Sequence, residues 1–269
     1  MNAATDPTPP PPGPAPAAIG PRVAALRASD PWRWLRAGWA DFVRCPGIGL
    51  FYGACFLAMG QALLWVFRAA PAYVLALSAG FLLVGPLLCL GLYHASRVLQ
   101  RGGTPRLGDS LGAWWPSKGT LAIFGGVLLI LEMLWGRASL VVFAVSFNSM
   151  PDPQRLLGQL LSGENLEFLI TWCSVGAVFA GLIFVTSVVS IPMILDRGTD
   201  AITAGLTSIR ACLENPGVML AWGALIVLLT GAALALPLMA GLLVVGPVLG
   251  HASWHAYRSA VPADPAQAP

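Results

Sequence analysis

The chain has 269 residues, of which 57% are hydrophobic and only 10% carry a charge, whereas roughly 25% of the residues in an ordinary soluble domain are charged. Fifteen Lys and Arg residues against twelve Asp and Glu residues leave a net charge of +3, which is too small and too dispersed for a nucleic-acid-binding surface. This composition argues against a soluble enzyme, a nucleic-acid-binding module and a disordered chain, and it predicts a protein that resides largely in lipid.

The two ends of the chain are predicted to be disordered tails. Residues 1–21 contain eight prolines, no basic residue and no apolar run, so they resemble neither a signal peptide nor a membrane span. We therefore expect a cytoplasmic tail over residues 1–28 and a second tail, rich in Pro and Ala, over residues 261–269. Residues 29–260 are expected to form a single membrane domain.

Long intervals without a charged residue predict six membrane-spanning helices. The longest lie at 45–67, 69–96, 168–195 and 215–257 and contain 23, 28, 28 and 43 residues. About 20 apolar residues cross the hydrocarbon layer as a helix, so the first three intervals accommodate one span each and the fourth accommodates two. A sixth apolar stretch is interrupted by Glu132 and Arg137. Because the apolar runs are continuous rather than alternating, we predict helical spans over 47–67, 72–95, 119–140, 168–195, 217–237 and 241–257.

The positions of the basic residues predict the orientation of these spans. Lys and Arg residues near the ends of spans are retained on the cytoplasmic side. If the N-terminus is inside, twelve of the fifteen basic residues are cytoplasmic, and only Arg68, Arg137 and Arg155 are outside. Both termini are therefore expected to be cytoplasmic.

Sequence repeats divide the membrane domain into three units, at about 30–97, 106–197 and 200–258. The segment Gly-Pro-Leu-Leu at 85–88 precedes Tyr-His-Ala-Ser-Arg at 93–97, just as Gly-Pro-Val-Leu at 246–249 precedes Trp-His-Ala-Tyr-Arg at 254–258. Residues 191–197 form a looser copy. The repeat-marking residues are Pro86, His94, Arg97, Pro192, Asp196, Arg197, Pro247, His255 and Arg258. Duplication is the preferred explanation, and convergence of cytoplasmic span ends on aromatic and basic residues is the alternative.

An amphipathic stretch precedes each pair of predicted spans. In the first unit, Trp32, Leu35, Trp39 and Phe42 share one predicted face and Arg33, Arg36 and Arg44 the opposite one; in the third, Ile202, Leu206, Ile209 and Leu213 are aligned. We expect these helices to lie on the inner leaflet, where anionic lipids attract arginine. The predicted fold class is therefore an all-α polytopic membrane protein with six transmembrane helices in three hairpins, each preceded by an interfacial helix.

Two features are candidates for chemistry inside the membrane domain. His251 and His255 are four residues apart on one helix face, a spacing that can hold a metal. No acidic or thiolate third ligand is nearby in the sequence, so we predict no metal, haem or other cofactor. Glu132 is the only carboxylate inside a predicted span and is a candidate for ion coupling, unless the span ends near residue 135 and places Glu132 among the headgroups.

Several segments carry a family resemblance. Gly-Trp-Ala-Asp-Phe at 38–42, Phe-Tyr-Gly at 51–53 and the segments 85–97, 187–197, 215–224 and 250–258 resemble the bacterial integral membrane proteins grouped as domain of unknown function 2189. The resemblance implies an inner-membrane protein of Gram-negative-type bacteria without an established activity. Some members are labelled as cytochrome c oxidase subunits, but a catalytic haem-copper subunit needs about six histidine ligands and this chain has three.

The sequence carries none of the common enzyme signatures: it has no nucleophile elbow, metalloprotease motif or phosphate-binding loop. We therefore expect a non-enzymatic inner-membrane scaffold, assembly or lipid-interacting factor. Its expected partners are the lipid bilayer, anionic inner-leaflet lipids or another membrane protein, and no nucleic acid. One alternative is a small-solute or ion transporter that uses Glu132. Another is haem or metal handling through the interfacial histidines.

Overall fold

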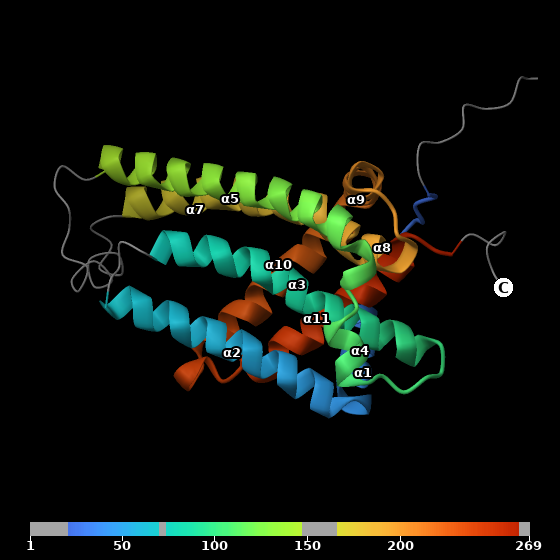
Figure 1. Ribbon diagram of the computed structural model, residues 1–269. Coiled ribbons are helices and arrows are strands. Elements are labelled where there is room, and N and C mark those ends of the chain that lie inside the picture. The colour runs from blue at the N-terminus through green and yellow to red at the C-terminus, as the bar shows by residue number, and fades with distance from the viewer. Residues whose placement is uncertain (1–20, 70–73, 147–165, 264–269) are drawn as a thin grey trace, which may run out of the picture.

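The computed structural model describes residues 21–69, 74–146 and 166–263, and every regular element in these ranges is a helix (Figure 1). Four helical stretches are long and apolar enough to cross a membrane, at Pro46–Val66, Leu107–Ser146, Leu166–Arg197 and Pro216–Ala235. The predicted all-helical class and the presence of apolar helices of membrane-spanning length are therefore confirmed. The predicted number of six spans is not settled by these four helices.

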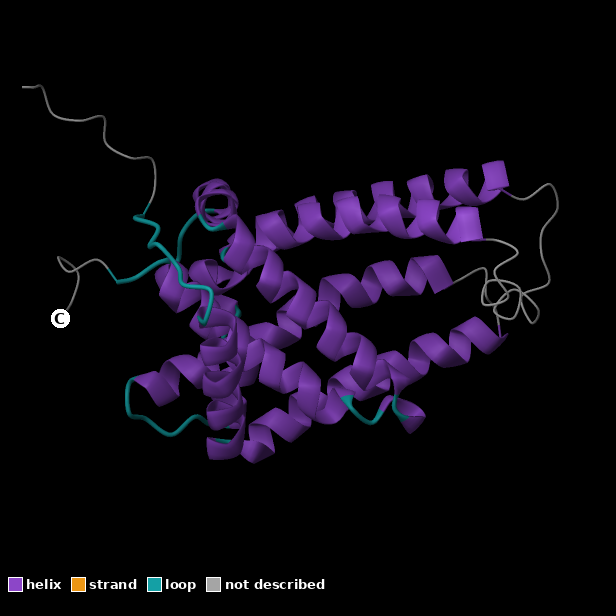
Figure 2. Cartoon of the chain, turned by 180° about the vertical axis from the view of Figure 1, so that it is seen from behind, coloured by secondary structure: helices purple, strands orange, loops and turns teal. Residues whose placement is uncertain are grey.

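The long helices form the body of the molecule. They are α2 (Pro46–Ala69), α3 (Val74–Gln100), α5 (Lys118–Ser146), α7 (Leu166–Ser187), α10 (Pro216–Ala235) and α11 (Leu242–Ala260). Helices α2, α3, α5 and α7 run side by side along the long direction of the molecule (Figures 1 and 2). Helix α2 contacts α3, α5 contacts α7 and α10 contacts α11. A 3-10 turn, η3 (Pro237–Met239), separates α10 from α11.

The fourth predicted span, 168–195, is interrupted in the structure. Helix α7 ends at Ser187, and α8 (Ser190–Arg197) follows after a turn. Pro192 lacks the N–H that would bond to the carbonyl four residues earlier, so it weakens a continuous helix at this point. Ser208 from α9 (Ala201–Glu214) compensates, because its hydroxyl accepts from the N–H of Val189 at 3.2 Å and donates to the carbonyl of Val185 at 2.7 Å.

Two amphipathic helices lie across one end of the long helices. They are α1 (Asp30–Arg44) and α9, and Figure 1 shows α9 end-on while α2, α3, α5 and α7 run in the plane of the picture. The short elements α4 (Leu107–Leu111) and η2 (Trp115–Ser117) lie at the same end. Cys45 and Asn215 end α1 and α9 with nearly the same backbone conformation, φ −133° and ψ 60° against φ −132° and ψ 52°.

Both helices expose large apolar side chains. On α1 these include Trp32 and Trp39 of the predicted apolar face, which are 60% and 52% exposed, whereas Phe42 of that face is buried. The buried face of α1 also carries Trp34, which packs edge-on against Trp222 at 5.6 Å. Helix α1 therefore has apolar residues on two faces, one toward the protein and one toward its surroundings. On α9 the predicted apolar stripe is the exposed one, including Ile202, Leu206 and Leu213.

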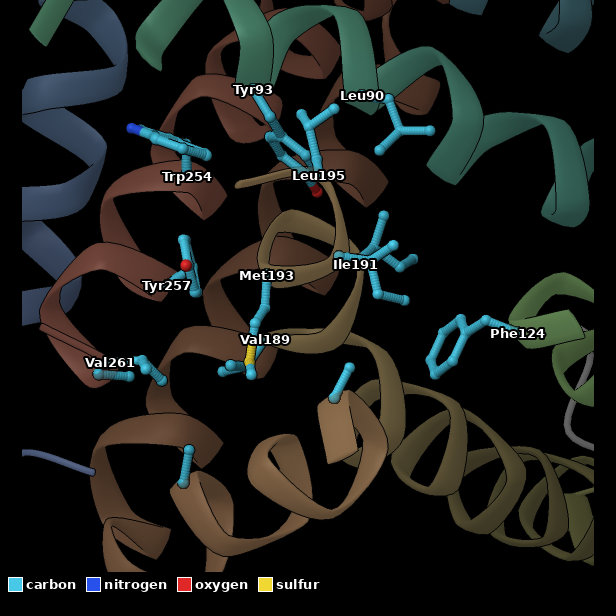
Figure 3. Close-up of a cluster of buried hydrophobic side chains, with 14 of the residues drawn as sticks. Leu90, Tyr93, Phe124, Val189, Ile191, Met193, Leu195, Trp254, Tyr257 and Val261 are labelled. Carbon is cyan, nitrogen blue, oxygen red and sulfur yellow. The ribbon is translucent and has the colours of Figure 1, made fainter. Parts of the chain in front are cut away.

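Helix α11 is the centre of the packing. It contacts α1, α2, α3, α8 and α10, and Trp254, Tyr257 and Ala252 on it are almost completely buried. Figure 3 shows Trp254 and Tyr257 of α11 grouped with residues of α3 and α8 in the main apolar cluster. Pro247 interrupts the hydrogen bonding of α11 and frees the carbonyl of Leu243. Helix α2 approaches closely at that carbonyl, where a Cβ on Gly53 would lie 2.1 Å from the oxygen.

The predicted N-terminal tail, 1–28, lies only partly within the described residues. Residues 21–29 form an extended segment that is bonded to the ends of three helices. The side chain of Asn215 accepts from the N–H of Leu26 at 2.7 Å and donates to the carbonyl of Ala24 at 3.1 Å, and the N–H of Ala24 donates to the carbonyl of Ala260 at 2.9 Å. This segment is therefore part of the folded structure. Residues 1–20 and 264–269 lie outside the described residues.

The contact of α2 with α11 gives the first prediction. Gly53→Ala should lower the free energy of unfolding by about 1–3 kcal/mol, because the added methyl group overpacks a rigid backbone contact. The measurement is thermal or denaturant unfolding in detergent, followed by tryptophan fluorescence. Gly47→Ala on the same helix is the control, since nothing lies within 4 Å of a Cβ there. Equal stability of the two variants would contradict the close approach.

Candidate functional site

A buried carboxylate, Asp41, joins three helices at the end where α1 and α9 lie. Asp41 is only 4% exposed, and its Oδ2 accepts from the Ser96 hydroxyl at 2.7 Å and from His255 Nε2 at 2.8 Å. Ser96 belongs to α3 and His255 to α11. Because an unpaired buried charge is costly, these two donors allow α1 to present a carboxylate to the interior of the protein.

The protonation of His251 follows from its neighbours. Its Nδ1 lies 2.8 Å from Ser96 Oγ. A hydroxyl has one hydrogen, and Ser96 donates it to Asp41, so Nδ1 of His251 must carry the hydrogen and donate to Ser96. His251 is then a neutral imidazole with a bare Nε2. Among the described residues this atom is buried and has no hydrogen-bond partner.

The chain of hydrogen bonds continues beyond His255 toward the protein surface. Nδ1 of His255 lies 3.2 Å from Nε2 of Gln100, and Oε1 of Gln100 accepts from the indole N–H of Trp254 at 2.9 Å. With His255 neutral, every bond in the chain has one donor and one acceptor. From Trp254 on one side and from His251 on the other, each group donates to the next, and Asp41 is the final acceptor of both series. The arrangement holds α1, α3 and α11 in one register and concentrates negative charge on a single carboxylate.

The electrostatics of Asp41 favour the ionised carboxylate. Burial by itself raises the pKa of Asp41, but the hydrogen bonds from His255 and Ser96 act in the opposite direction. The net result is a pKa below the ordinary value of 3.8. Through its bonds to Ser96 of α3 and His255 of α11, the carboxylate links α1 to both helices.

A second polar cluster joins α8 to α11. The carboxylate of Asp196 accepts from the hydroxyl of Tyr257 at 2.9 Å and from the guanidinium of Arg258 at 3.0 Å. Arg197 donates from Nε to the hydroxyl oxygen of Tyr257 at 3.0 Å and from Nη2 to the carbonyl of Val261 at 2.9 Å. Each of the three ionised groups therefore has a partner on the neighbouring helix or in the segment after it.

The structure brings most of the repeat-marking residues to the same end. Arg97 of α3 donates to the carbonyl of Leu195 in α8 at 3.0 Å, and its Nη2 lies 3.1 Å from His94 Nδ1. Helices α3, α8 and α11 contact one another here. The prolines of the motif precede these residues in the same helices: Pro86 is in α3, Pro192 in α8 and Pro247 in α11.

Glu132 is separate from both clusters. It lies in the middle of α5, fourteen residues or about 21 Å from either end, and it is 8% exposed. Its face of α5 also carries the buried residues Leu128 and Ser139. Helix α5 extends to Ser146, beyond the predicted end at residue 140. If α5 crosses the bilayer, Glu132 is therefore at hydrocarbon depth and not among the headgroups.

The two histidines that are weak candidates for metal binding take part in the hydrogen-bond network around Asp41. His251 and His255 do stand near one carboxylate, but three of their four ring nitrogens are in hydrogen bonds with Ser96, Asp41 and Gln100. Within the described ranges no group of three or more His, Cys, Asp or Glu side chains is placed to hold a metal ion.

Asp41, Ser96 and Gln100 were missed as site residues by the sequence reasoning. One signal was available: Asp41 falls on the same face of α1 as Trp34 and Gly38, at spacings of four and seven residues from Trp34. A carboxylate on a stripe that is otherwise apolar indicates a buried partner. Ser96 and Gln100 gave no such signal, because their roles depend on which residues of α11 face them.

Residues 73–196 match the model of a family described as a predicted integral membrane protein, DUF2189. The family resemblance is confirmed. The DUF2189 match extends from the start of α3 through α8 and includes Arg97 and Asp196, whereas α1, α10 and α11 lie outside it. No curated protein and no solved structure matches the chain.

Asp41 should make the stability dependent on pH in acid. Because the pKa of Asp41 is lower in the folded protein, the ionised carboxylate stabilises the folded state. This contribution to the free energy of unfolding is present above about pH 3.8 and is lost as the pH falls through the folded-state pKa. Asp41→Asn should lose about 1–3 kcal/mol near neutral pH, since one buried donor then faces an amide N–H₂. It should also show a shallower loss of stability than the wild type in acid.

The measurement is the unfolding midpoint in detergent between about pH 2 and 7. Asp109→Asn provides the control, because Asp109 lies on the exposed side of α4. If both variants follow the wild-type curve, Asp41 does not carry the proposed charge.

The cluster around Asp196 gives a separate prediction. A double-mutant cycle of Asp196→Asn and Arg258→Gln should yield a coupling free energy of about 1 kcal/mol, because the Asp196 side chain is 8% exposed. The pair Arg210 and Glu214 on α9 serves as the comparison, with side chains 35% and 48% exposed, and should give about 0.3–0.5 kcal/mol. A larger coupling in the exposed pair would contradict the assigned role of the cluster.

Proposed function

We propose that the protein is a non-enzymatic integral protein of the bacterial inner membrane that acts as a scaffold, assembly factor or lipid-interacting factor. The observation that carries the proposal is the apolar outer surface of the long helices. Large aliphatic residues on α5, α7 and α10 are more than half exposed, among them Ile123, Val141, Ile170, Val178, Leu220 and Val227. Soluble proteins rarely expose continuous apolar surface on this scale.

The proposed topology has six spans with both termini in the cytoplasm. Helices α2, α3, α5, α7, α10 and α11 have 19 to 29 residues, and about 20 residues suffice to cross the hydrocarbon layer. The described segments nearest both termini lie at one end, together with α1, α8 and α9 (Figures 1 and 2). Most of the basic residues belong to these elements and connections, as the positive-inside rule requires of a cytoplasmic side.

Duplication of a helix-plus-hairpin unit is part of the proposal. Helix α1 ends at Arg44 and α2 begins at Pro46. Helix α9 ends at Glu214 and α10 begins at Pro216, so both boundaries are shifted by 170 positions. The matching backbone conformations of Cys45 and Asn215 support the same correspondence. The middle unit departs from it, because α4 and η2 replace a long amphipathic helix.

A scaffold role is supported by what the two interfacial helices expose. Both α1 and α9 are fixed to the protein by one face and leave a second apolar face uncovered, represented by Trp32 and Ile202. Such a face suits insertion between headgroups of anionic lipids or contact with another membrane protein. The buried carboxylate of Asp41 is bonded within the protein, to Ser96 and His255.

The test is reconstitution of the full chain in nanodiscs and proteoliposomes. A scaffold should show no hydrolysis or oxidation of candidate substrates and no solute uptake above empty vesicles, and native mass spectrometry should report retained lipid. Reproducible turnover or uptake would overturn the proposal.

A second candidate function, ion or solute transport, is favoured by one observation. Glu132 is buried in the middle of α5, and an ionisable group at that depth is a common coupling site. If the protein is a transporter, Glu132→Gln should abolish proton-coupled flux, measured with a pH-sensitive dye inside proteoliposomes. Glu167→Gln is the control, because Glu167 is exposed at the start of α7. Under the scaffold proposal neither variant nor the wild type shows flux above empty vesicles.

A further inference from the structure

A narrow apolar groove lies between α1, α10 and α11. Its volume is about 390 Å³. Arg36 and Trp39 of α1 form one end, and the walls include Leu229 of α10 and Val244, Val245 and Val248 of α11. Apart from the guanidinium of Arg36, these side chains offer only hydrocarbon and an indole to whatever occupies the groove.

The direction of the groove matches that of a lipid in the bilayer. Helix α1 lies across the ends of the long helices (Figure 2), so Arg36 and Trp39 are at the level expected for headgroups. Val248 lies at the level of α1, because a Cβ on Gly38 of α1 would lie 2.6 Å from its carbonyl oxygen. Val244, which also lines the groove, is one turn or about 6 Å farther along α11. The groove therefore runs from the headgroup level into the adjacent part of the hydrocarbon layer.

The charged end of the groove has an unused donor group. In the described ranges the Arg36 guanidinium makes no hydrogen bond and no ion pair, unlike Arg33, which pairs with Asp30 at 2.7 Å. A guanidinium binds phosphate through paired N–H donors. Trp39 beside it stacks on Phe42 with ring centroids 5.7 Å apart and remains half exposed, as indole rings at headgroup level do.

We propose that this groove binds one anionic phospholipid, with an acyl chain along α10 and α11 and the phosphate at Arg36. The proposal deepens the lipid-interacting role and rests on the proposed membrane topology. The groove volume favours an alkyl chain over a helix of a partner protein, because a helix about 10 Å wide and 20 Å long fills roughly 1,600 Å³. The charge of Arg36 favours an anionic headgroup over a zwitterionic one.

The experiment uses the full chain in nanodiscs of phosphatidylcholine. Phosphatidylglycerol or phosphatidylcholine with brominated acyl chains is added in increasing mole fraction, and quenching of tryptophan fluorescence is recorded. Subtracting the signal of Trp39→Phe in each background isolates the quenching of Trp39. The variants are Arg36→Gln, Val244→Phe to fill the groove, and Arg44→Gln. The last is the matched control, since it removes the same charge from α1 but does not line the groove.

We expect Trp39 to be quenched at several-fold lower mole fractions of the brominated phosphatidylglycerol than of the phosphatidylcholine. Arg36→Gln should reduce this preference about fivefold, Arg44→Gln should preserve it, and Val244→Phe should weaken quenching by both lipids. Equal quenching by both lipids in the wild type, an equal loss in Arg36→Gln and Arg44→Gln, or undiminished quenching in Val244→Phe would overturn the site. Any of these results would leave the scaffold proposal unaffected. Conversely, substrate turnover or solute uptake would overturn the scaffold proposal but not the selective binding of lipid in the groove.

Discussion

The hydrocarbon interior of a bilayer cannot form hydrogen bonds, and this constraint governs how the chain places its polar groups. In the described part of the chain, the hydrogen-bonded charges gather at one end of the long helices, where Asp41 and Asp196 each accept from two donors. Where backbone bonding is broken inside the helices, another element supplies the partner. Ser208 does so at the turn between α7 and α8, bonding both Val185 and Val189. The exposed sides of the long helices are left with hydrocarbon.

The same constraint explains why α11 is the centre of the fold. Its last four turns carry His251, His255, Trp254 and Tyr257, whose polar atoms bond to α1, α3 and α8. An apolar helix without such groups would slide against its neighbours at little cost, because lipid and aliphatic side chains are similarly apolar. Dispersion forces alone would specify the register of these helices only weakly. The two polar clusters fix it, because each hydrogen bond forms at one register.

Much of the helical architecture could be predicted from the sequence, because charge-free intervals identify segments that are long and apolar enough to cross a membrane. Helices α2, α3 and α10 begin close to the predicted limits. The turn before Ser190 interrupts the predicted span 168–195. The span is predicted as continuous because Pro192 alone does not decide whether a helix breaks: the break also needs a group that accommodates it, here Ser208. The buried face of α1 was also missed. A period of 3.6 residues identifies apolar faces but does not say which of two faces meets protein and which meets lipid.

The two faces of α1 suggest how the core and the surface of the protein are connected. Asp41 on the inner face ties α1 to α3 and α11, and Gly38 lets the backbones of α1 and α11 come close, since a Cβ there would lie 2.6 Å from the nitrogen of Ala252. This rigid attachment fixes Arg36 and Trp39 on the other side of α1 above the groove formed with α10 and α11. A lipid held by Arg36 would therefore contact three helices whose relative positions depend on the buried carboxylate.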